Sequence, residues 1–354
     1  MTGWEDPFEA RLRWVAVDPA TWRETGAVSG VVLGGTVDLD ASDPVKASAS
    51  VDVEGPLDLS GGLLRLYLDA HGADGGARTA CIGTFGAEVP RLTVSSTGSV
   101  GSASLYGTLR LAQDSAPGAS VHVPAGADPV AAAADALRRA GLQTVAERGP
   151  QRLAEARTYG LSAEGGACDD LLSIASDLCA AAGFREPAPD PWGRALLRRE
   201  LDDGARAPDW SLAEGPDCRF LDSMSLERDP AGPNCVKVVC SSGSGYTVAT
   251  ARDDDPASET STVRRGREVW EVVRPSEDLD HEGALALARR TLRERLAPLR
   301  AVTLRHVYFP LALGDVFDLS WPSAGLSGRF RAASVSYDLG APGLLMTVKG
   351  EEVA

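Results

Sequence analysis

Serine and histidine are the side chains that could make this chain a hydrolase. The densest serine cluster is Ser241-Ser-Gly-Ser-Gly245. Its spacing differs from the Gly-x-Ser-x-Gly pattern that exposes a nucleophilic serine on a strand-to-helix turn, and it is more typical of a hairpin. The four histidines stand at positions 71, 122, 281 and 306 and form no His-x-x-x-His or His-Glu-x-x-His pair. The sequence therefore predicts neither a serine nucleophile nor a metalloprotease centre.

Carboxylates are the next candidates, because they bind metal ions. Asp253, Asp254 and Asp255 are consecutive, whereas a calcium loop needs ligands at alternate positions, a central glycine and a distal glutamate. A solvated acidic run is the preferred interpretation of these residues, as it is for Asp202-Asp203.

The six cysteines predict neither a zinc site nor a disulfide framework. They stand at positions 81, 168, 179, 218, 235 and 240, without a Cys-x-x-Cys pair or a histidine at ligand spacing, so buried free thiols are expected. No glycine-rich run has the spacing of a phosphate loop or a dinucleotide fingerprint. We therefore expect no catalytic residue, no cofactor and no bound metal.

A helix predicted over residues 280–296 is the best candidate for binding a partner. One face is apolar, with Leu285, Ala288, Leu292 and Leu296, and should pack against the protein. The other face carries Arg289, Arg290, Arg293 and Arg295. These arginines either pair with acidic side chains of this chain or dock an acidic neighbour, because guanidinium groups form bidentate pairs with carboxylates.

Residues 252–267 are a second candidate segment, which includes Asp253, Asp254, Asp255, Arg264 and Arg265. The segment is rich in turn-forming residues and too polar to bury, which predicts an exposed loop. We expect it to be mobile in the isolated protein and to become ordered only against a partner.

Composition limits the classes of function. The 354 residues include 35 basic and 50 acidic side chains, a net charge of −15, which disfavours a nucleic-acid-binding surface. The length predicts two to three domains. The sequence has no apolar run long enough to span a membrane and no secretion signal at its N-terminus, so a soluble protein made in a cytoplasm is expected.

Residues 1–118 are predicted to form an N-terminal β domain. Val45 to Val53 alternates between apolar and polar residues, as in a strand with one buried face. Leu63 to Leu68 is apolar on both faces and indicates a more deeply buried strand. The strand pattern continues over 81–85, 89–94 and 103–109.

Residues 119–205 are predicted to form a small α+β domain. Asp128 and Pro129 should begin a helix, as its N-cap and first helical residue, and Gly141 should end it. A second helix is predicted over 169–182, with an apolar stripe. The turn Asp190-Pro-Trp-Gly193 then precedes a strand.

Residues 206–354 are predicted to form a C-terminal β domain with one packed helix. Residues 234–241 and 246–251 flank the serine-glycine turn and predict a hairpin. Residues 270–273 should rejoin the sheet, and the helix over 280–296 should lie against it. A strand beginning at Val302 follows, and the domain ends in closely spaced strands over 316–319, 329–339 and 344–349.

Three segments resemble the bacteriophage tail hub family, also called baseplate hub or tail-tip hub proteins. The turn Pro310-Leu-Ala-Leu-Gly314-Asp315, with its preceding helix and closing strands, resembles the C-terminal barrel of that family. The run from Ile82-Gly-Thr-Phe85 to Val89-Pro-Arg-Leu92 and the helix over 168–183 resemble two further hub segments. Their order covers nearly the whole chain. The resemblance implies a mainly β fold with an α+β insert between two tube-like β-barrel domains.

The resemblance also implies a function. Tail hubs, which are related to the base of type VI secretion spikes, are structural proteins of the virion at the distal tail tip. Three chains with two barrels each form a homotrimer that adapts the six-fold tail to a three-fold tip. The implied partners are the distal tail protein, the tape measure protein and a tail fibre or tip protein, with DNA only in transit and no membrane in the free virion. Hydrolase and receptor-binding activities of the family reside in C-terminal extensions, so neither is expected in a chain ending at Ala354.

Two other interpretations stay open. One is the base of a contractile-tail or type VI-like spike. The other is a carbohydrate-active or carbohydrate-binding β protein that uses Trp4, Trp14 and Trp22 as platforms, although tryptophans more often pack in cores. If three chains do surround DNA, inward-facing positions should carry more Asp and Glu than Lys and Arg, because a basic lining would retain DNA.

Overall fold

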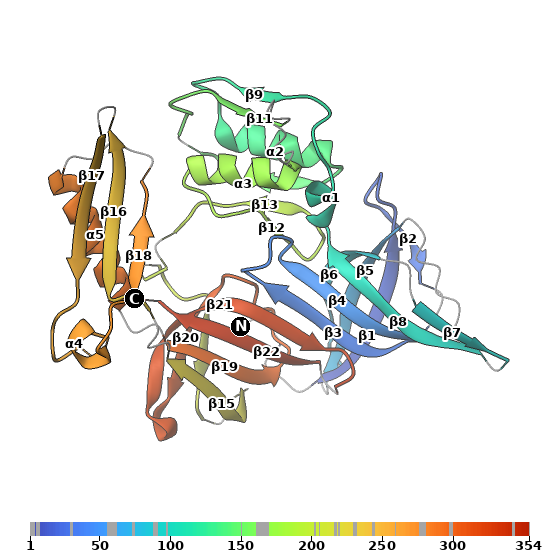
Figure 1. Cartoon of the computed structure of the whole chain (residues 1–354). Coiled ribbons are helices and arrows are strands. Elements are labelled where there is room, and N and C mark those ends of the chain that lie inside the picture. Colours follow the sequence, from blue (N-terminus) through green and yellow to red (C-terminus); the bar gives the residue numbers. More distant parts are fainter. Residues whose placement is uncertain are drawn as a thin grey trace.

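The part of the chain that the structure describes is mainly β, with 49% of its residues in strands and 16% in helices. The computed structural model describes residues 4, 8–28, 31–54, 62–72, 75–87, 91–96, 98–149, 151–160, 170–201, 203–204, 206–215, 218, 220–228, 232–242, 245–258, 260–275, 281–296, 300–341 and 344–353. Figure 1 shows a broad sheet, a helical unit above it and a third unit to one side.

The broad sheet has two halves. The N-terminal half contains β1 (Phe8–Val17), β2 (Glu24–Ala27), β3 (Val31–Asp40), β4 (Ala47–Glu54), β5 (Leu63–Gly72), β6 (Ala77–Ala87), β7 (Arg91–Ser95) and β8 (Gly98–Gly107). The C-terminal half contains β14 (Trp210–Ala213), β15 (Phe220–Arg228), β19 (Arg300–Val307), β20 (Val316–Trp321), the short 3₁₀ helix η1 (Pro322–Ala324), β21 (Leu326–Asp338) and β22 (Leu345–Glu352). The strands predicted at the C-terminus are confirmed.

The two halves are one continuous sheet and not two separate barrels. Its order is β15-β19-β22-β21-β3-β4-β8-β6-β5-β1-β2, and β7, β14 and β20 branch from this path. The halves join where β21 pairs antiparallel with β3, with Val335 opposite Leu39. One core serves both halves and includes Val37, Leu66, Phe317 and Met346. Within the described strands no barrel closes, because the edges that would close each half are used to join them.

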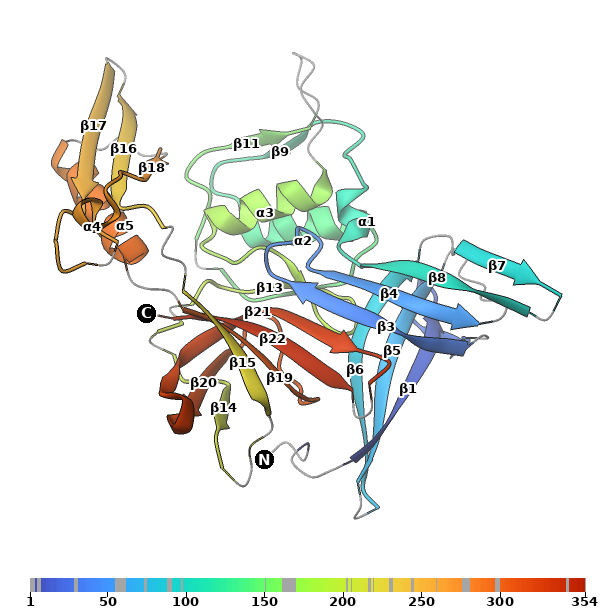
Figure 2. The ribbon, with the colours of Figure 1, turned by 60° about the horizontal axis from the view of Figure 1, so that its bottom comes forward.

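The α+β unit interrupts the sheet after β8. It contains α1 (Arg110–Gln113), β9 (Val121–Val123), α2 (Pro129–Arg139), β10 (Thr144–Ala146), β11 (Arg157–Tyr159), α3 (Leu171–Ala181), β12 (Ala188–Pro189) and β13 (Ala195–Leu197). The predicted N-cap of α2 is confirmed, since Asp128 Oδ1 accepts from Val130 N at 3.0 Å. The N-cap of α3 is Asp170, whereas the predicted start at residue 169 lies outside the described residues. Figures 1 and 2 show α2 and α3 lying between the β9–β11 pair and the strands β12 and β13.

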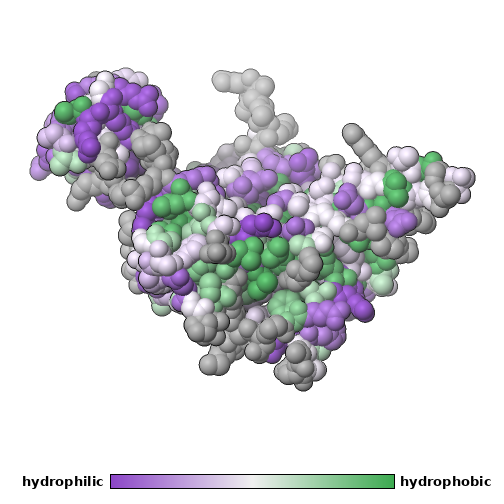
Figure 3. All heavy atoms as spheres, turned by 90° about the horizontal axis from the view of Figure 1, so that it is seen from below, coloured by the Kyte–Doolittle hydropathy of each residue, from purple (hydrophilic) through white to green (hydrophobic). Residues whose placement is uncertain are grey.

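Residues 232–296 form a third unit, here called the inserted unit. It contains β16 (Cys235–Ser242), β17 (Gly245–Arg252), α4 (Thr262–Arg265), β18 (Trp270–Val273) and α5 (His281–Leu296). Its sheet has the order β17-β16-β18, which confirms the predicted hairpin. The unit has its own core, in which Ala284, Ala288 and Leu292 of α5 pack on Val236 and Val238. In the space-filling view it is a separate lobe (Figure 3).

One prediction about this region is confirmed and one is wrong. Residues 270–273 rejoin the sheet of the predicted hairpin, where they pair with β16 of the inserted unit. Helix α5 packs on β16 and β17 and not on the strands that follow it. The reason is topological. Arg228 of β15 pairs with Arg300 of β19, so all of residues 229–299 interrupts one antiparallel pair, and the local hairpin buries the apolar stripe of the helix.

Candidate lining face and interaction surfaces

The large sheet has one polar face that crosses both halves. In β4 the residues Ala47, Ala49, Val51 and Val53 are buried while the alternate positions are exposed, as the sequence predicts. The residues of β15, β19, β22, β21, β3 and β4 that point away from the shared core form one surface, which we call the polar face. Its small polar residues are Thr36, Ser48, Ser50, Ser225, Thr303, Ser334, Ser336 and Thr347.

The polar face is continuous at the junction of the two halves. Asp38 of β3 lies opposite Ser336 of β21 on one side and Ser48 of β4 on the other. The Ser336 hydroxyl donates to Asp38 Oδ1 at 2.6 Å. The ladder and this side-chain contact together make a smooth polar surface without a seam between the halves.

The polar face is acidic. Its carboxylates are Asp38, Asp40, Asp52, Glu54, Glu227, Asp338 and Glu351, and its basic residues are Arg305, Arg329, Arg331 and Lys349. The Ser42 hydroxyl donates to Asp40 at 2.6 Å and holds the pKa of Asp40 below its ordinary value. Asp40 is therefore charged at neutral pH. A surface of this kind repels a polyanion.

Among the strands that the structure describes, the large sheet ends in two open edges. Strand β1 pairs with β5 along its whole length, and within the described residues β2 adds a second neighbour only at Val15, Ala16 and Val17. At the other end, β15 pairs with β19 and exposes Leu221 and Leu226. Unpaired strand edges of this length are ready sites for the addition of another strand.

The turn Asp190–Gly193 fixes the α+β unit to the N-terminal half. Thr84 Oγ1 donates to Pro191 O at 2.9 Å, and Thr108 Oγ1 donates to Gly193 O at 2.9 Å. Arg65 Nη2 donates to Trp192 O at 3.2 Å. Gly193 has a φ of +81°, and a Cβ there would lie 2.8 Å from Thr108. Glycine is therefore required at this close approach.

Asp203 fixes the same unit to the C-terminal half. This carboxylate is 7% exposed and accepts from Arg185 Nη2 at 2.8 Å and from Arg206 Nε at 3.0 Å. Arg331 of β21 lies 3.4 Å away. We call these four residues the Asp203 cluster. The interpretation of Asp202-Asp203 as a solvated acidic run is wrong for Asp203, because folding surrounds it with the guanidinium groups of the nearby Arg206 and of the more distant Arg185 and Arg331.

The triple aspartate organises a turn of the inserted unit. Asp253 is 6% exposed and accepts from Ser258 Oγ at 2.6 Å and Thr260 Oγ1 at 3.2 Å. Asp254 contacts Thr262, and Asp255 accepts from Ala257 N. Their carboxylates thus serve different local donors. Within the described part of the chain, no group of three or more His, Cys, Asp or Glu residues could hold a metal ion.

Asn234 completes the same turn. Its side chain is fully buried, donates to Thr260 O at 3.0 Å and Arg267 O at 3.1 Å, and accepts from Val269 N at 2.7 Å. Arg265 Nη1 donates to Gly232 O at 2.6 Å, whereas Arg264 is exposed. The prediction that residues 252–267 are too polar to bury is therefore wrong at Asp253 and Ser261, whose polar atoms are satisfied within the turn.

One arginine of α5 forms a well-defined ion pair within the inserted unit. Arg295 makes a bidentate pair with Glu271 of β18, at 2.9 and 3.0 Å, and this contact holds the pKa of Glu271 below its ordinary value. Arg289 and Arg290 are exposed, while the side chain of Arg293 lies outside the described part of the chain. Intramolecular pairing, one of the two interpretations of this face, is thus present at Arg295.

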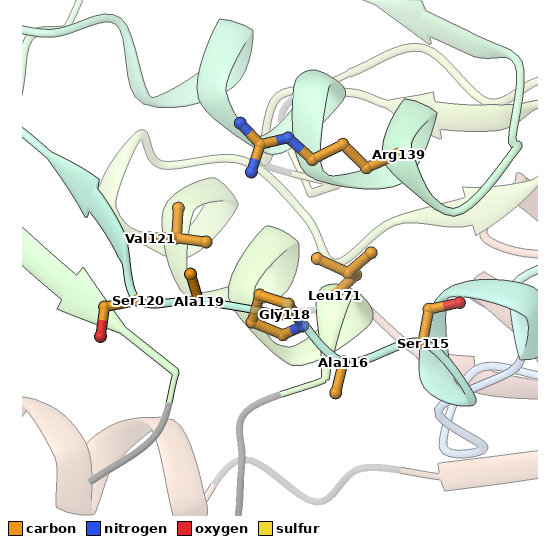
Figure 4. Close-up of a pocket in the computed structure, with 9 residues that line it drawn as sticks. Ser115, Ala116, Gly118, Ala119, Ser120, Val121, Arg139 and Leu171 are labelled. Atoms are coloured by element: carbon orange, nitrogen blue, oxygen red, sulfur yellow. The ribbon is translucent and has the colours of Figure 1, made fainter. Parts of the chain in front are cut away.

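Three remaining features bear on chemistry. Figure 4 shows a hollow of about 400 Å³ in the α+β unit, between residues 115–121, Leu171 and the exposed Arg139. Its polar lining is exposed, so it offers no buried anchor for a ligand.

The cysteines at 81, 179, 218, 235 and 240 are free, and burial raises the pKa of the Cys81 and Cys179 thiols to about 12. No helix within the described ranges is both long and apolar enough to cross a membrane.

Comparison with known proteins adds to this geometry. No family model and no curated protein matches the sequence. A tail protein from Neisseria meningitidis has 15% identical residues and a TM-score of 0.67, and the match covers 98% of this chain and 96% of that one. A 43 kDa tail protein of prophage MuSo2 from Shewanella oneidensis has 10% identity and a TM-score of 0.64, with coverage of 96% and 98%.

A chain of the Francisella PdpA–VgrG complex has 7% identity and a TM-score of 0.57, and the match covers 98% of this chain and 58% of that one. Identities this low establish the fold alone. The resemblance predicted from the sequence is confirmed at that level, and the chain has the fold of phage tail proteins over nearly its whole length.

Proposed function

We propose that this chain is a structural subunit of a phage tail and forms the tail hub. Three copies make a ring at the distal tail tip, where six similar sheet halves meet the six-fold tail above and a three-fold tip below. The ring contacts the distal tail protein, the end of the tape measure protein and a tail fibre or tip protein. DNA passes through its lumen during ejection.

The continuous sheet with two open edges carries this proposal. A sheet that ends in unpaired strands on both sides can continue into the next copy, and repetition of one heterologous contact closes a ring. Each copy contributes two joined halves, so three copies supply six. The barrel expected for each half is then completed by strands of neighbouring copies.

The polar face suits the lumen of such a ring. Its carboxylates outnumber its basic residues, so DNA finds few cationic contacts that would release counterions and passes without being retained. In this arrangement the turn Asp190–Gly193 and the Asp203 cluster hold the α+β unit in a fixed position on the sheet. Arg289 and Arg290 of α5 face solvent and are candidates for contact with an acidic partner.

The proposed role is non-enzymatic. The catalytic motifs are missing from the sequence, and the buried carboxylates that the structure describes serve structural contacts. We expect the purified chain to hydrolyse neither peptidoglycan, esters nor glycosides. Activity in a zymogram that is lost on replacement of one Asp, Glu, Ser or Cys would contradict this.

Light scattering tests the ring directly. We expect a trimer of the 37.0 kDa chain, either alone or after addition of the distal tail protein, because ring contacts weaken on dilution. A stable dimer or tetramer would refute the hub. A solved trimer with a positive or neutral lumen would refute the role of the polar face.

The base of a contractile or type VI-like spike is a second candidate. The match to the Francisella complex, which covers 98% of this chain, favours it. An image of the particle that carries this subunit separates the two candidates by the presence or absence of a sheath.

A further inference from the structure

The small sheet of the inserted unit has one face that α5 does not cover. Val236, Val238, Ala249 and Ala251 point towards α5 and are buried. The alternate residues point the other way, and we call them the outer face. Its large apolar members are Tyr246, Val248, Trp270 and Val272, which are 78%, 43%, 42% and 46% exposed.

The outer face is a single patch with basic borders. Val239 of the central strand lies opposite Val248, and Lys237 lies between Thr250 and Val272. Arg252 stands at the end of β17 and pairs with Glu268 at 2.6 Å, and Arg274 follows Val272 in the exposed continuation of β18. Lys237 and Arg274 add positive charge to the patch, whereas Arg252 is balanced by Glu268 and Asp254, and Trp270 Nε1 donates to Glu268 at 2.9 Å. The patch therefore suits a protein partner whose surface is apolar with carboxylates beside it.

The position of the inserted unit indicates which partner this is. The unit leaves the large sheet at the end of β15, and β15 is the open edge at which the proposed ring continues. A copy docked at that edge presents its N-terminal half, because β1 forms the opposite open edge. The inserted unit projects from the body of its own chain (Figures 1 and 2) and can therefore reach the neighbour.

Charge supports the same assignment. Residues 1–118 hold 8 basic and 15 acidic side chains, a net charge of −7 (8 − 15). Residues 232–296 hold 10 basic and 11 acidic side chains, a net charge of −1 (10 − 11). The excess of carboxylates in the N-terminal half is complementary to Lys237 and Arg274 of the outer face, and the near-neutral inserted unit offers it little repulsion.

We propose that the outer face docks on the N-terminal half of the next copy in the ring, with Trp270 and Tyr246 as its anchors. The inference rests on the proposed function, since it needs the ring. Tryptophan and tyrosine provide much of the binding energy in protein interfaces, whereas peripheral contacts provide little. The inserted unit is then a clasp that reinforces strand addition at the β15 edge.

The test is the association of the full-length double variant Y246S/W270S, measured by light scattering over a concentration series with and without the distal tail protein. We expect its trimer to dissociate at concentrations at least about tenfold higher than the unmodified trimer. The control V263S removes an apolar side chain that is 60% exposed on α4 of the same unit but outside the outer face. It should associate as the unmodified chain does.

Cross-linking gives a second readout that does not depend on the double variant. A photoreactive benzoylphenylalanine replaces Tyr246, and ¹⁵N-labelled and unlabelled chains are mixed before irradiation. We expect cross-links between copies that end in residues 1–118. Cross-links to any other region, or none between copies, would overturn the proposal.

The remaining outcomes separate this inference from the ring itself. A trimer of unchanged strength in Y246S/W270S refutes the clasp and leaves the hub intact. A chain that is monomeric under both conditions refutes the hub and the clasp together. Oligothymidine or a glycan that quenches the tryptophan fluorescence of the unmodified chain but not that of Y246S/W270S would assign the outer face to a different ligand and overturn the proposal.

Discussion

The α+β unit and the inserted unit both interrupt the large sheet, yet they relate to it differently. In the α+β unit, backbone carbonyls of the turn Asp190–Gly193 accept hydrogen bonds from side chains of the N-terminal half, and Arg185 donates a hydrogen bond to Asp203. The inserted unit uses its polar groups internally, as Asn234 and Glu271 illustrate. Both have cores of their own. A local core is thus enough to form a unit, whereas polar contacts at the junction determine its orientation.

The largest expected effect comes from breaking the Asp203 cluster. Replacing Asp203 with Ala removes the nearly buried carboxylate that three guanidinium groups share, although each keeps a second carboxylate nearby. Loss of these charge-assisted hydrogen bonds should cost about 3 kcal/mol. Hydrogen exchange, followed by mass spectrometry, should accelerate in residues 184–213 and stay unchanged in β16 and β17. The control is Asp135→Ala, which removes an exposed pair with Arg138 and should change stability by less than about 0.5 kcal/mol. An equal acceleration of hydrogen exchange in the α+β unit and in the inserted unit would contradict the proposed difference between them.

A smaller effect is expected inside the inserted unit. Replacing Asn234 with Ala leaves Val269 N, Thr260 O and Arg267 O without their buried partner, at a cost of about 2 kcal/mol. Trypsin should then cleave at the exposed Arg264 and Arg267 more than about tenfold faster, because cleavage follows local opening. Cleavage within the α+β unit should not change. The expectation that residues 252–267 are cut first in the unmodified chain stays a prediction, which the same digest measures.

Thr108→Val removes one hydrogen bond between the large sheet and the α+β unit. Valine has nearly the same shape as threonine but cannot donate to Gly193 O, and Thr108 is fully buried. We expect a loss of about 1 kcal/mol in urea unfolding. Thr79→Val removes a donor to Asp69 at an exposed position, and its effect should be clearly smaller. If both variants lose the same stability, burial of the turn is not what holds the unit.

The smallest expected effect is a pH dependence of the inserted unit. Arg295 holds the folded-state pKa of Glu271 below its ordinary value of 4.5. The pair therefore contributes stability above pH 4.5 and loses it as the pH falls through the folded pKa. Because both side chains are partly exposed, the contribution should stay below about 1 kcal/mol. Hydrogen exchange of α5 at decreasing pH should show this loss in the unmodified chain and not in Glu271→Gln.

Local patterns in the sequence predicted local structure well. Asp128 and Pro129 specify the start of α2, and the alternation of Val45 to Val53 specifies which face of β4 is buried, because both depend on near neighbours in the chain. The stripe of Ala288 and Leu292 likewise shows which side of α5 is buried. It does not show what buries it, since several apolar surfaces would serve.

Contacts between distant residues were not predictable in this way. Asp203 meets Arg331, which is 128 residues further along the chain, and β3 pairs with β21 across most of the chain. No spacing rule connects such positions. The polar face and the Asp203 cluster are therefore recognisable only in the folded structure, although Ser48, Ser50 and Asp52 of β4 alternate with apolar residues in the sequence.

The pairing of Arg228 with Arg300 has a consequence for the order of folding. Strands β15 and β19 are neighbours in space but distant in sequence, and closing so long a loop directly is slow. The inserted unit consists of local contacts and has its own core, so it can fold early. Once folded, it brings its two ends together, and the effective loop that β15 and β19 must close becomes short. The folded inserted unit thereby allows β15 and β19 to pair at a rate like that of strands joined by a short loop, and the open edge of the sheet forms quickly.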